Sequence, residues 1–303
     1  MNFDDDNPHS PDPMNPPVPW EAIEGRRSTE HLPNAVAAPV QNPVPANGGL
    51  PEDLRVPWGW TDLLLLVLLY VAGSIVISLP VLIVFMLAGV SRAQLTNSSS
   101  EQGLFVIASQ TLLSVGVLAY LAAEMRVRYR SPFWRTIGWR PIETRHKSRG
   151  LVYLGIFCGG LLFSFLIQFT SAAFGTKAKL PIENLLQNQR NAIFFMLIAV
   201  TLAPVLEETM FRGYIFPVVA RSFGVGAGII ATGTLFGLLH AIQLWGGWVQ
   251  IGLLIVVGIF FTYVRSVTRT VVASYLLHLS YNSVPLLLYV IATHGFRQPP
   301  PGM

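Results

Sequence analysis

The sequence has little charge and almost no cysteine. Charged residues make up 12% of the 303 residues and hydrophobic residues 52%, so the charge content is about half that of an average soluble domain. The single cysteine, Cys158, excludes an internal disulfide. Because it lies in an apolar run, we expect a small buried hydrophobe rather than a catalytic thiol.

Two common signals are also missing. The amino terminus, MNFDDDNPHS, is acidic and has no apolar core, so we expect no signal peptide. The soluble metalloprotease pattern H-E-x-x-H does not occur, so a metal site does not follow from a motif.

What the chain does have is long uncharged runs. Several exceed 18 residues, which predicts a multi-pass membrane protein. We expect spans over roughly 58–90, 103–123, 151–174, 191 into the Glu207 region, 224–244, 248–264 and 271–292. The fold class is therefore an all-α transmembrane bundle of about seven to eight helices, with an intramembrane polar cavity. The eighth would come from a break in the long first segment or at Gly213–Pro217.

Residues 1–56 differ from the rest of the chain. They hold eleven of the 22 prolines and a net charge of −6, whereas residues 57–303 have a net charge of +10. Such a segment cannot bury enough apolar surface to offset its ordering entropy, so we expect a disordered tail. Trp58 and Trp60 follow it, as aromatic anchors at the membrane interface do.

The strongest topology signal is the loop 124–149. Its basic residues are Arg126, Arg128, Arg130, Arg135, Arg140, Arg145, Lys147 and Arg149. The positive-inside rule predicts that this loop, and with it the 1–56 tail, is cytoplasmic. Phe133, Trp134, Ile137 and Trp139 suggest a short amphipathic segment on the membrane surface. The basic surplus indicates contact with the lipid bilayer rather than with nucleic acid.

Three ionisable residues interrupt a very apolar stretch. Glu207, Glu208 and Arg212 follow sixteen residues, 191–206, that carry no charge. Ionisable groups at membrane depth are costly unless paired or facing a polar cavity, so they mark a candidate functional site. Glu208 and Arg212 are four residues apart and can pair, whereas Glu207 points about 100° away.

Two later helices bring further polar groups to the same depth. His240 lies in the predicted fifth span, and His278 and Asn282 lie four residues apart in the seventh. Gly233 and Gly237 would let neighbouring helices approach closely. Convergence of three helices is more informative than any one residue, although each could instead serve packing.

These residue types suit hydrolysis inside a membrane. Glu207 could act as general base on a water that His240 orients, and His278 with Asn282 could stabilise an oxyanion. Glu208 and Arg212 would support them. Alternatively, Glu207, His240 and His278 could hold Zn²⁺, for which a carboxylate and two imidazoles are suitable ligands.

The ordered motifs resemble a known family. Glu207–Glu208–x–x–x–Arg212, Phe236–x–x–x–His240 and His278–x–x–x–Asn282 are similar to the three signatures of the CPBP (CAAX protease and bacteriocin-processing, Abi) intramembrane proteases. The resemblance covers about residues 150–290. It implies a protease core at 150–295, leaving 57–149 as accessory transmembrane helices and the basic loop. It also implies the catalytic roles given above, with or without a metal.

The predicted function is therefore an intramembrane endopeptidase in a cell membrane. Its substrate would be a membrane-associated or prenylated (CAAX-type) protein or peptide. Three alternatives remain: a non-proteolytic immunity or chaperone-like partner protein, a transporter or proton relay using the same buried residues, and a substrate-binding scaffold. The transporter alternative is expected to show two similar halves, and the sequence has no such repeat.

Overall fold

The computed structural model describes residues 51–97, 99–144, 148–174, 180–186 and 188–298. Within these ranges the chain is helical, and no strand occurs. The long helices are α2 (Trp60–Leu87), α4 (Ser99–Val127), α6 (Arg149–Phe174), α12 (Trp248–Thr268) and α13 (Val271–Ala292). A further continuous run, Gln189–Phe223, consists of α8 (Gln189–Val200), α9 (Leu202–Glu207), the π-helix η2 (Glu208–Ile215) and α10 (Phe216–Phe223). The short elements are η1 (Glu52–Leu54), α3 (Arg92–Asn97), α5 (Phe133–Thr136) and α7 (Glu183–Leu186).

Six helices in the described part are long and apolar enough to cross a membrane. The seventh apolar helix, α11 (Val225–Leu239), has only 15 residues and is about 22 Å long. The helical membrane bundle predicted from sequence is thus confirmed. The run 189–223 is not split at Gly213–Pro217, and Pro80 lies inside α2 without ending it.

Helix α11 ends earlier than the predicted span 224–244, and His240 explains why. Its Nδ1 lies 2.8 Å from the Phe236 carbonyl oxygen, which would otherwise accept the His240 backbone N–H. That N–H donates to Gly237 instead, at 3.2 Å, and a turn replaces the next helical residues. The helix therefore stops before it has crossed a full hydrocarbon core of about 30 Å.

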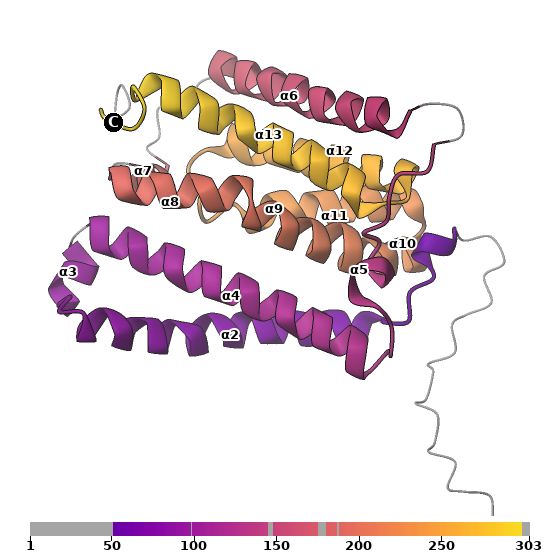
Figure 1. Cartoon of the computed structure of the whole chain (residues 1–303), viewed down its shortest axis with the longest axis horizontal. Coiled ribbons are helices and arrows are strands. Elements are labelled where there is room, and N and C mark those ends of the chain that lie inside the picture. The colour runs from indigo at the N-terminus through magenta and orange to yellow at the C-terminus, as the bar shows by residue number, and fades with distance from the viewer. Residues whose placement is uncertain (1–50, 98, 145–147, 175–179, 187, 299–303) are drawn as a thin grey trace, which may run out of the picture. The chain divides into compact units, whose positions relative to one another are not determined.

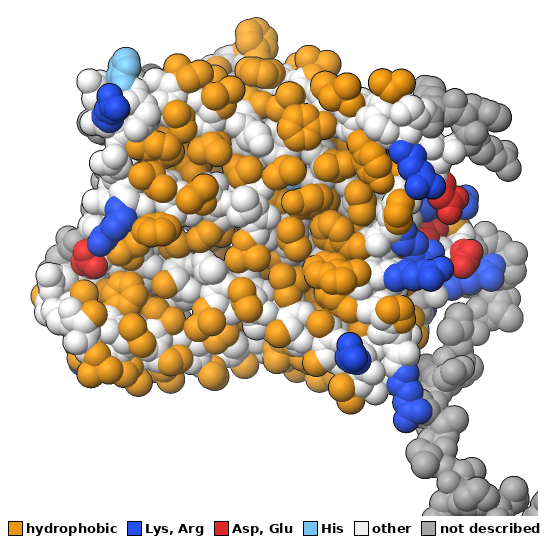
Figure 2. Space-filling model, viewed as in Figure 1, with side chains coloured by type: hydrophobic (Ala, Val, Ile, Leu, Met, Phe, Trp, Pro, Cys, Tyr) orange, Lys and Arg blue, Asp and Glu red, His pale blue; other side chains and the backbone are white. Residues whose placement is uncertain are grey.

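The helices alternate in direction and form three groups. Helices α2 and α4 pack together on one side, α6 packs along α13 on the other, and α8–α10, α11 and α12 lie between them (Figure 1). Apolar side chains cover the broad face in Figure 2, and charges gather at its edges. The carboxyl ends of α4, α10 and α12 lie at one end of the bundle with the amino ends of α2, α6 and α13, and we call it the basic end (Figure 1). The arginines in or next to these helix ends are Arg55, Arg126, Arg128, Arg130, Arg135, Arg140, Arg149, Arg221, Arg265 and Arg269.

The segment before α2 is fixed to the basic end. Arg221 donates to the carbonyl oxygens of Val56 and Trp58 at 2.7 and 2.9 Å, and Arg265 pairs with Asp53 at 2.6 Å. Residues 1–50 of the predicted tail lie outside the described residues, but its last residues are packed. Trp58 is not the expected interface anchor, because it is fully buried, whereas Trp60 is 50% exposed.

The aromatic part of the basic loop has an exposed side and a buried side. Trp134 is 51% exposed, whereas Ile137 is 1% exposed, and the Thr270 hydroxyl donates to the carbonyls of Gly138 and Arg140. Packing against the start of α13 therefore draws this loop into the bundle. Cys158 also differs from expectation, because it is exposed on the outside of α6 rather than buried.

Close packing of α11 on α12 depends on two glycines, as the sequence predicted. A Cβ at Gly237 would lie 2.7 Å from the backbone nitrogen of Ile255, and one at Gly233 would collide with the backbone of Ile259. The approach of these helices brings the end of α11, with His240, next to the bundle interior.

Candidate active site

The predicted acidic pair lies where an α-helix becomes a π-helix. Glu207 is the last residue of α9, and Glu208 is the first of η2. π-Helical segments are rare and often occur at functional sites. The two adjacent carboxylates have different environments: the Glu208 side chain is 0% exposed, whereas that of Glu207 is 22% exposed.

Glu208 and Arg212 form the ion pair that their spacing predicts. Their oxygen and nitrogen are 3.0 Å apart, and neither side chain is exposed. Arg212 also donates to the Gly258 carbonyl at 3.0 Å, and its guanidinium lies 4.4 Å from the ring centroid of Phe236. These contacts bind η2 to α12 and α11.

His278 stands between the two carboxylates. Its Nδ1 is 2.9 Å from Glu208 Oε1, and its Nε2 is 3.7 Å from Glu207 Oε2. The rings of Phe236 and Phe261 lie 5.9 and 5.0 Å from the imidazole. Glu208 therefore fixes the orientation of His278 while the other ring nitrogen faces Glu207.

His240 faces the second oxygen of Glu207. The distance from its Nε2 to Glu207 Oε1 is 3.9 Å, and both side chains are partly exposed, at 23% and 22%. Helix α11 is short enough that its carboxyl end lies beside Glu207. One carboxylate thus meets two imidazoles that come from two different helices.

The hydrogen bonds indicate which ring nitrogens carry hydrogen. The Phe236 carbonyl can only accept, so Nδ1 of His240 must be a donor. The Glu208 carboxylate, paired with Arg212, likewise accepts from Nδ1 of His278. A neutral imidazole then presents an Nε2 lone pair, so both rings direct an acceptor at Glu207. Separations of 3.7 and 3.9 Å exceed a direct hydrogen bond but suit a bridging water that donates to both sides.

Asn282 was predicted to act with His278 on an oxyanion, but its described hydrogen bond leads to another helix. Its Nδ2 donates to the Ala199 carbonyl of α8 at 2.8 Å, and no described contact joins it to His278 or Glu207. This bond ties α13 to the end of α8, just before α9. A role in oxyanion stabilisation stays a prediction, which the second hydrogen of Nδ2 would have to fulfil.

Zinc was the second possibility for Glu207, His240 and His278. The donor set is chemically suitable. In the part of the chain that the structure describes, however, no three His, Cys, Asp or Glu side chains are grouped closely enough to hold a metal ion. The zinc alternative for Glu207, His240 and His278 stays a prediction.

One neighbour of the site was not singled out from sequence. The Thr262 hydroxyl accepts from Arg212 Nε at 3.3 Å. Thr262 lies one helical turn after Gly258, whose carbonyl is another acceptor for Arg212.

Comparison with known proteins bears on this site directly. No curated protein and no solved structure matches the chain. A family model described as "Type II CAAX prenyl endopeptidase Rce1-like" matches residues 189–284, which include Glu207, Glu208, Arg212, His240, His278 and Asn282. The resemblance to the CPBP family is thereby confirmed, and over these residues the chain carries the pattern of a CAAX-type intramembrane protease family.

Proposed function

We propose that the protein is an intramembrane endopeptidase that uses a glutamate-activated water. The substrate would be a membrane-associated protein or peptide, of which a prenylated CAAX-type protein is one kind. By the positive-inside rule, the basic end and the amino-terminal tail would face the cytoplasm of a cell membrane.

One observation carries the proposal. The two oxygens of Glu207 face the Nε2 atoms of His240 and His278 at 3.9 and 3.7 Å, and the side chains of Glu207 and His240 are partly exposed. A carboxylate with acceptors on both sides favours a bound proton donor, and water is the donor that hydrolysis needs. A structural ion pair would instead be closed and fully buried, as Glu208–Arg212 is.

The reaction follows from these positions. A water held between Glu207 and His240 would transfer a proton to the Glu207 carboxylate while its oxygen attacks the peptide carbonyl carbon. The oxygen–carbon bond forms, and the carbonyl becomes an oxyanion, which the second amide hydrogen of Asn282 Nδ2 would stabilise. When the carbon–nitrogen bond breaks, the proton passes from Glu207 to the leaving amine, which restores the carboxylate.

The remaining residues of the site would hold Glu207 and the two histidines in position. Glu208 holds His278 through Nδ1, and Arg212 neutralises Glu208 in an apolar interior. Asn282 fixes α13 against α8. Loss of Glu208 or Arg212 should therefore reduce both activity and folding, whereas loss of Glu207 should remove activity alone.

The test compares membranes that contain wild type, Glu207→Gln or Glu183→Gln. Glu183 lies in the short helix α7, outside the elements that carry Glu207, His240 and His278, so Glu183→Gln is a matched carboxylate-to-amide control. We expect peptides that accumulate or disappear with wild type and Glu183→Gln but not with Glu207→Gln or His240→Ala. If no peptide changes, while a phenotype persists in wild type and Glu207→Gln alike, the protease proposal fails.

A chelator separates the metal-free version from the zinc version. Activity of the purified protein should survive chelation, because in this proposal Glu207 activates the water without a metal ion. Loss of activity that zinc restores would instead assign Glu207, His240 and His278 as ligands.

A further inference from the structure

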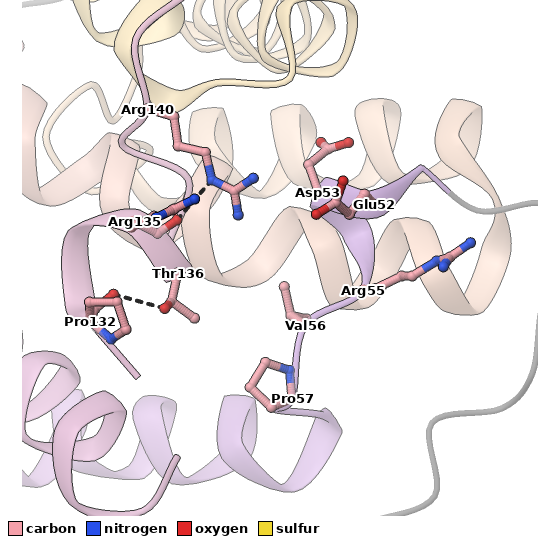
Figure 3. A pocket seen from close by; sticks show the side chains of 9 residues that line it. All are labelled: Glu52, Asp53, Arg55, Val56, Pro57, Pro132, Arg135, Thr136 and Arg140. Atoms are coloured by element: carbon pink, nitrogen blue, oxygen red, sulfur yellow. Dashed lines mark hydrogen bonds between the residues drawn. The ribbon is translucent and has the colours of Figure 1, made fainter. Parts of the chain in front are cut away.

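The basic end contains a polar pocket of about 300 Å³ (Figure 3). It is lined by Arg55, Arg135 and Arg140, together with Glu52 and Asp53. None of the three arginines forms an ion pair with a described residue. The three arginines of the pocket therefore lack a described carboxylate within ion-pair distance.

The charges around this pocket leave a positive excess. Asp53 is already neutralised by Arg265, which binds it at 2.6 Å. The lining then holds three guanidiniums and one further carboxylate, that of Glu52, although Arg55 extends away from Arg135 and Arg140 (Figure 3). An anion in the pocket would be attracted, and guanidinium groups suit phosphate because they donate two parallel hydrogen bonds.

An apolar cleft of about 500 Å³ lies beside the polar pocket. Its walls come from the basic loop, α6, α9 and α13, and include Trp134, Trp139, Tyr275, Val205 and Val272. Trp139 contacts the rings of Trp134 and Tyr275 at centroid distances of 5.5 and 5.1 Å, so the aromatic wall is continuous.

Arg140 lines both the pocket and the cleft. A cationic recess and an apolar cleft that share one arginine match a molecule with an anionic head and an apolar chain. We propose that this place binds one anionic phospholipid, with its phosphate beside Arg135 and Arg140 and an acyl chain in the aromatic cleft. The basic end of a membrane-spanning bundle is also where headgroups and acyl chains meet.

The cleft adjoins the helix that carries the candidate base. Val205 precedes Glu207 by two residues, and the Trp139 indole donates to the Thr209 hydroxyl at 3.0 Å. A bound acyl chain would therefore contact Val205 of α9 and Trp139, which is hydrogen-bonded to Thr209 of η2. The proposal itself does not depend on peptidase activity, because it concerns binding alone.

The full chain, purified in neutral detergent, tests the proposal by native mass spectrometry. Phosphatidylglycerol and phosphatidylcholine are titrated separately, and the affinity for the first bound lipid is measured. Arg135→Ala/Arg140→Ala should weaken phosphatidylglycerol binding about thirtyfold, from the loss of two cations near a headgroup. Arg126→Ala, an exposed arginine of the same end outside the pocket, should leave it unchanged.

Two further variants keep the result interpretable. Arg135→Lys/Arg140→Lys keeps both charges and should retain most of the binding, which separates charge from a disturbed loop. Val272→Phe fills the cleft without changing charge and should weaken both lipids. Excess inorganic phosphate should not displace the lipid, because it cannot occupy the cleft.

Three outcomes would overturn the proposal. One is equal affinity for the two lipids. Another is an equal loss of phosphatidylglycerol affinity in Arg126→Ala and in Arg135→Ala/Arg140→Ala, which would indicate that the lipid is attracted by the overall positive charge of this end and not by the pocket. The third is displacement of the lipid by a cleaved peptide substrate, which would assign the cleft to the substrate instead. Failure of the protease proposal would leave the lipid measurement unaffected, so the two are distinguishable.

Discussion

Changing Glu208 to glutamine should destabilise the protein far more than the same change at its neighbour Glu207. Glu208 and Arg212 are 3.0 Å apart with no exposure of either side chain. Glutamine keeps the shape but removes the negative charge, which leaves a guanidinium buried without a counter-charge. Breaking a buried ion pair in this way costs about 3–5 kcal/mol.

Other contacts set where in this range the effect should fall. Arg212 keeps its bonds to Gly258 and Thr262 and its contact with the Phe236 ring, which moderates the loss. The change at Glu208 also removes the negative charge from its hydrogen bond to His278, which increases the loss of stability. Glu207, by contrast, is 22% exposed and has no charged nitrogen within hydrogen-bond distance, so we expect a change within about 0.5 kcal/mol.

The free energy of unfolding can be measured by denaturant titration of each purified variant in mixed micelles. The double variant Glu208→Gln/Arg212→Met should recover part of the loss, because replacing both charges removes the unpaired guanidinium. Equal destabilisation by Glu207→Gln and Glu208→Gln would refute the division of the pair into an exposed base and a buried support. So would an Arg212→Met variant as stable as wild type.

Two other pairs of variants test the packing. Gly233→Ala should destabilise the protein by about 1–3 kcal/mol, because its Cβ would collide with the backbone of α12; Gly226→Ala, which meets no atom within 4 Å, should not, and equal effects would contradict the close approach. Trp58→Phe should cost about 1–2 kcal/mol by removing the buried indole bond to the Tyr214 carbonyl. Trp60→Phe, at a side chain that is 50% exposed, should change stability by under about 0.5 kcal/mol, and thermal unfolding measures both.

The sequence alone determined the membrane bundle and the approximate position of its six long apolar helices, whereas the predicted span 224–244 corresponds to the shorter α11. Hydropathy is a property of consecutive residues, so runs of 18 or more apolar residues identify spans without tertiary information. The Glu208–Arg212 pair was equally predictable, since residues four apart on a helix are neighbours whatever surrounds them. Helix-to-helix packing at Gly233 and Gly237 followed from the absence of a side chain.

Predictions that depended on which surface a side chain would face were less secure. Trp58 and Ile137 are residue types that often lie at a membrane interface. Both are buried, because the segments that carry them pack against other helices at the basic end. Cys158 lies in an apolar run and is nevertheless exposed, because the side of a membrane helix that faces lipid is as apolar as the side that packs on other helices.

Only the tertiary structure decided how the polar groups meet. Sequence placed Glu207, His240 and His278 in three helices of similar depth, but their distances depend on the early end of α11 and on the π-turn at Glu208. The same packing directs Asn282 to Ala199 rather than toward His278. Local spacing specifies which residues share a helix face, whereas the separation between faces is set by how the helices pack. The chemistry of Glu207 therefore depends on contacts with residues 33 and 71 positions away along the chain.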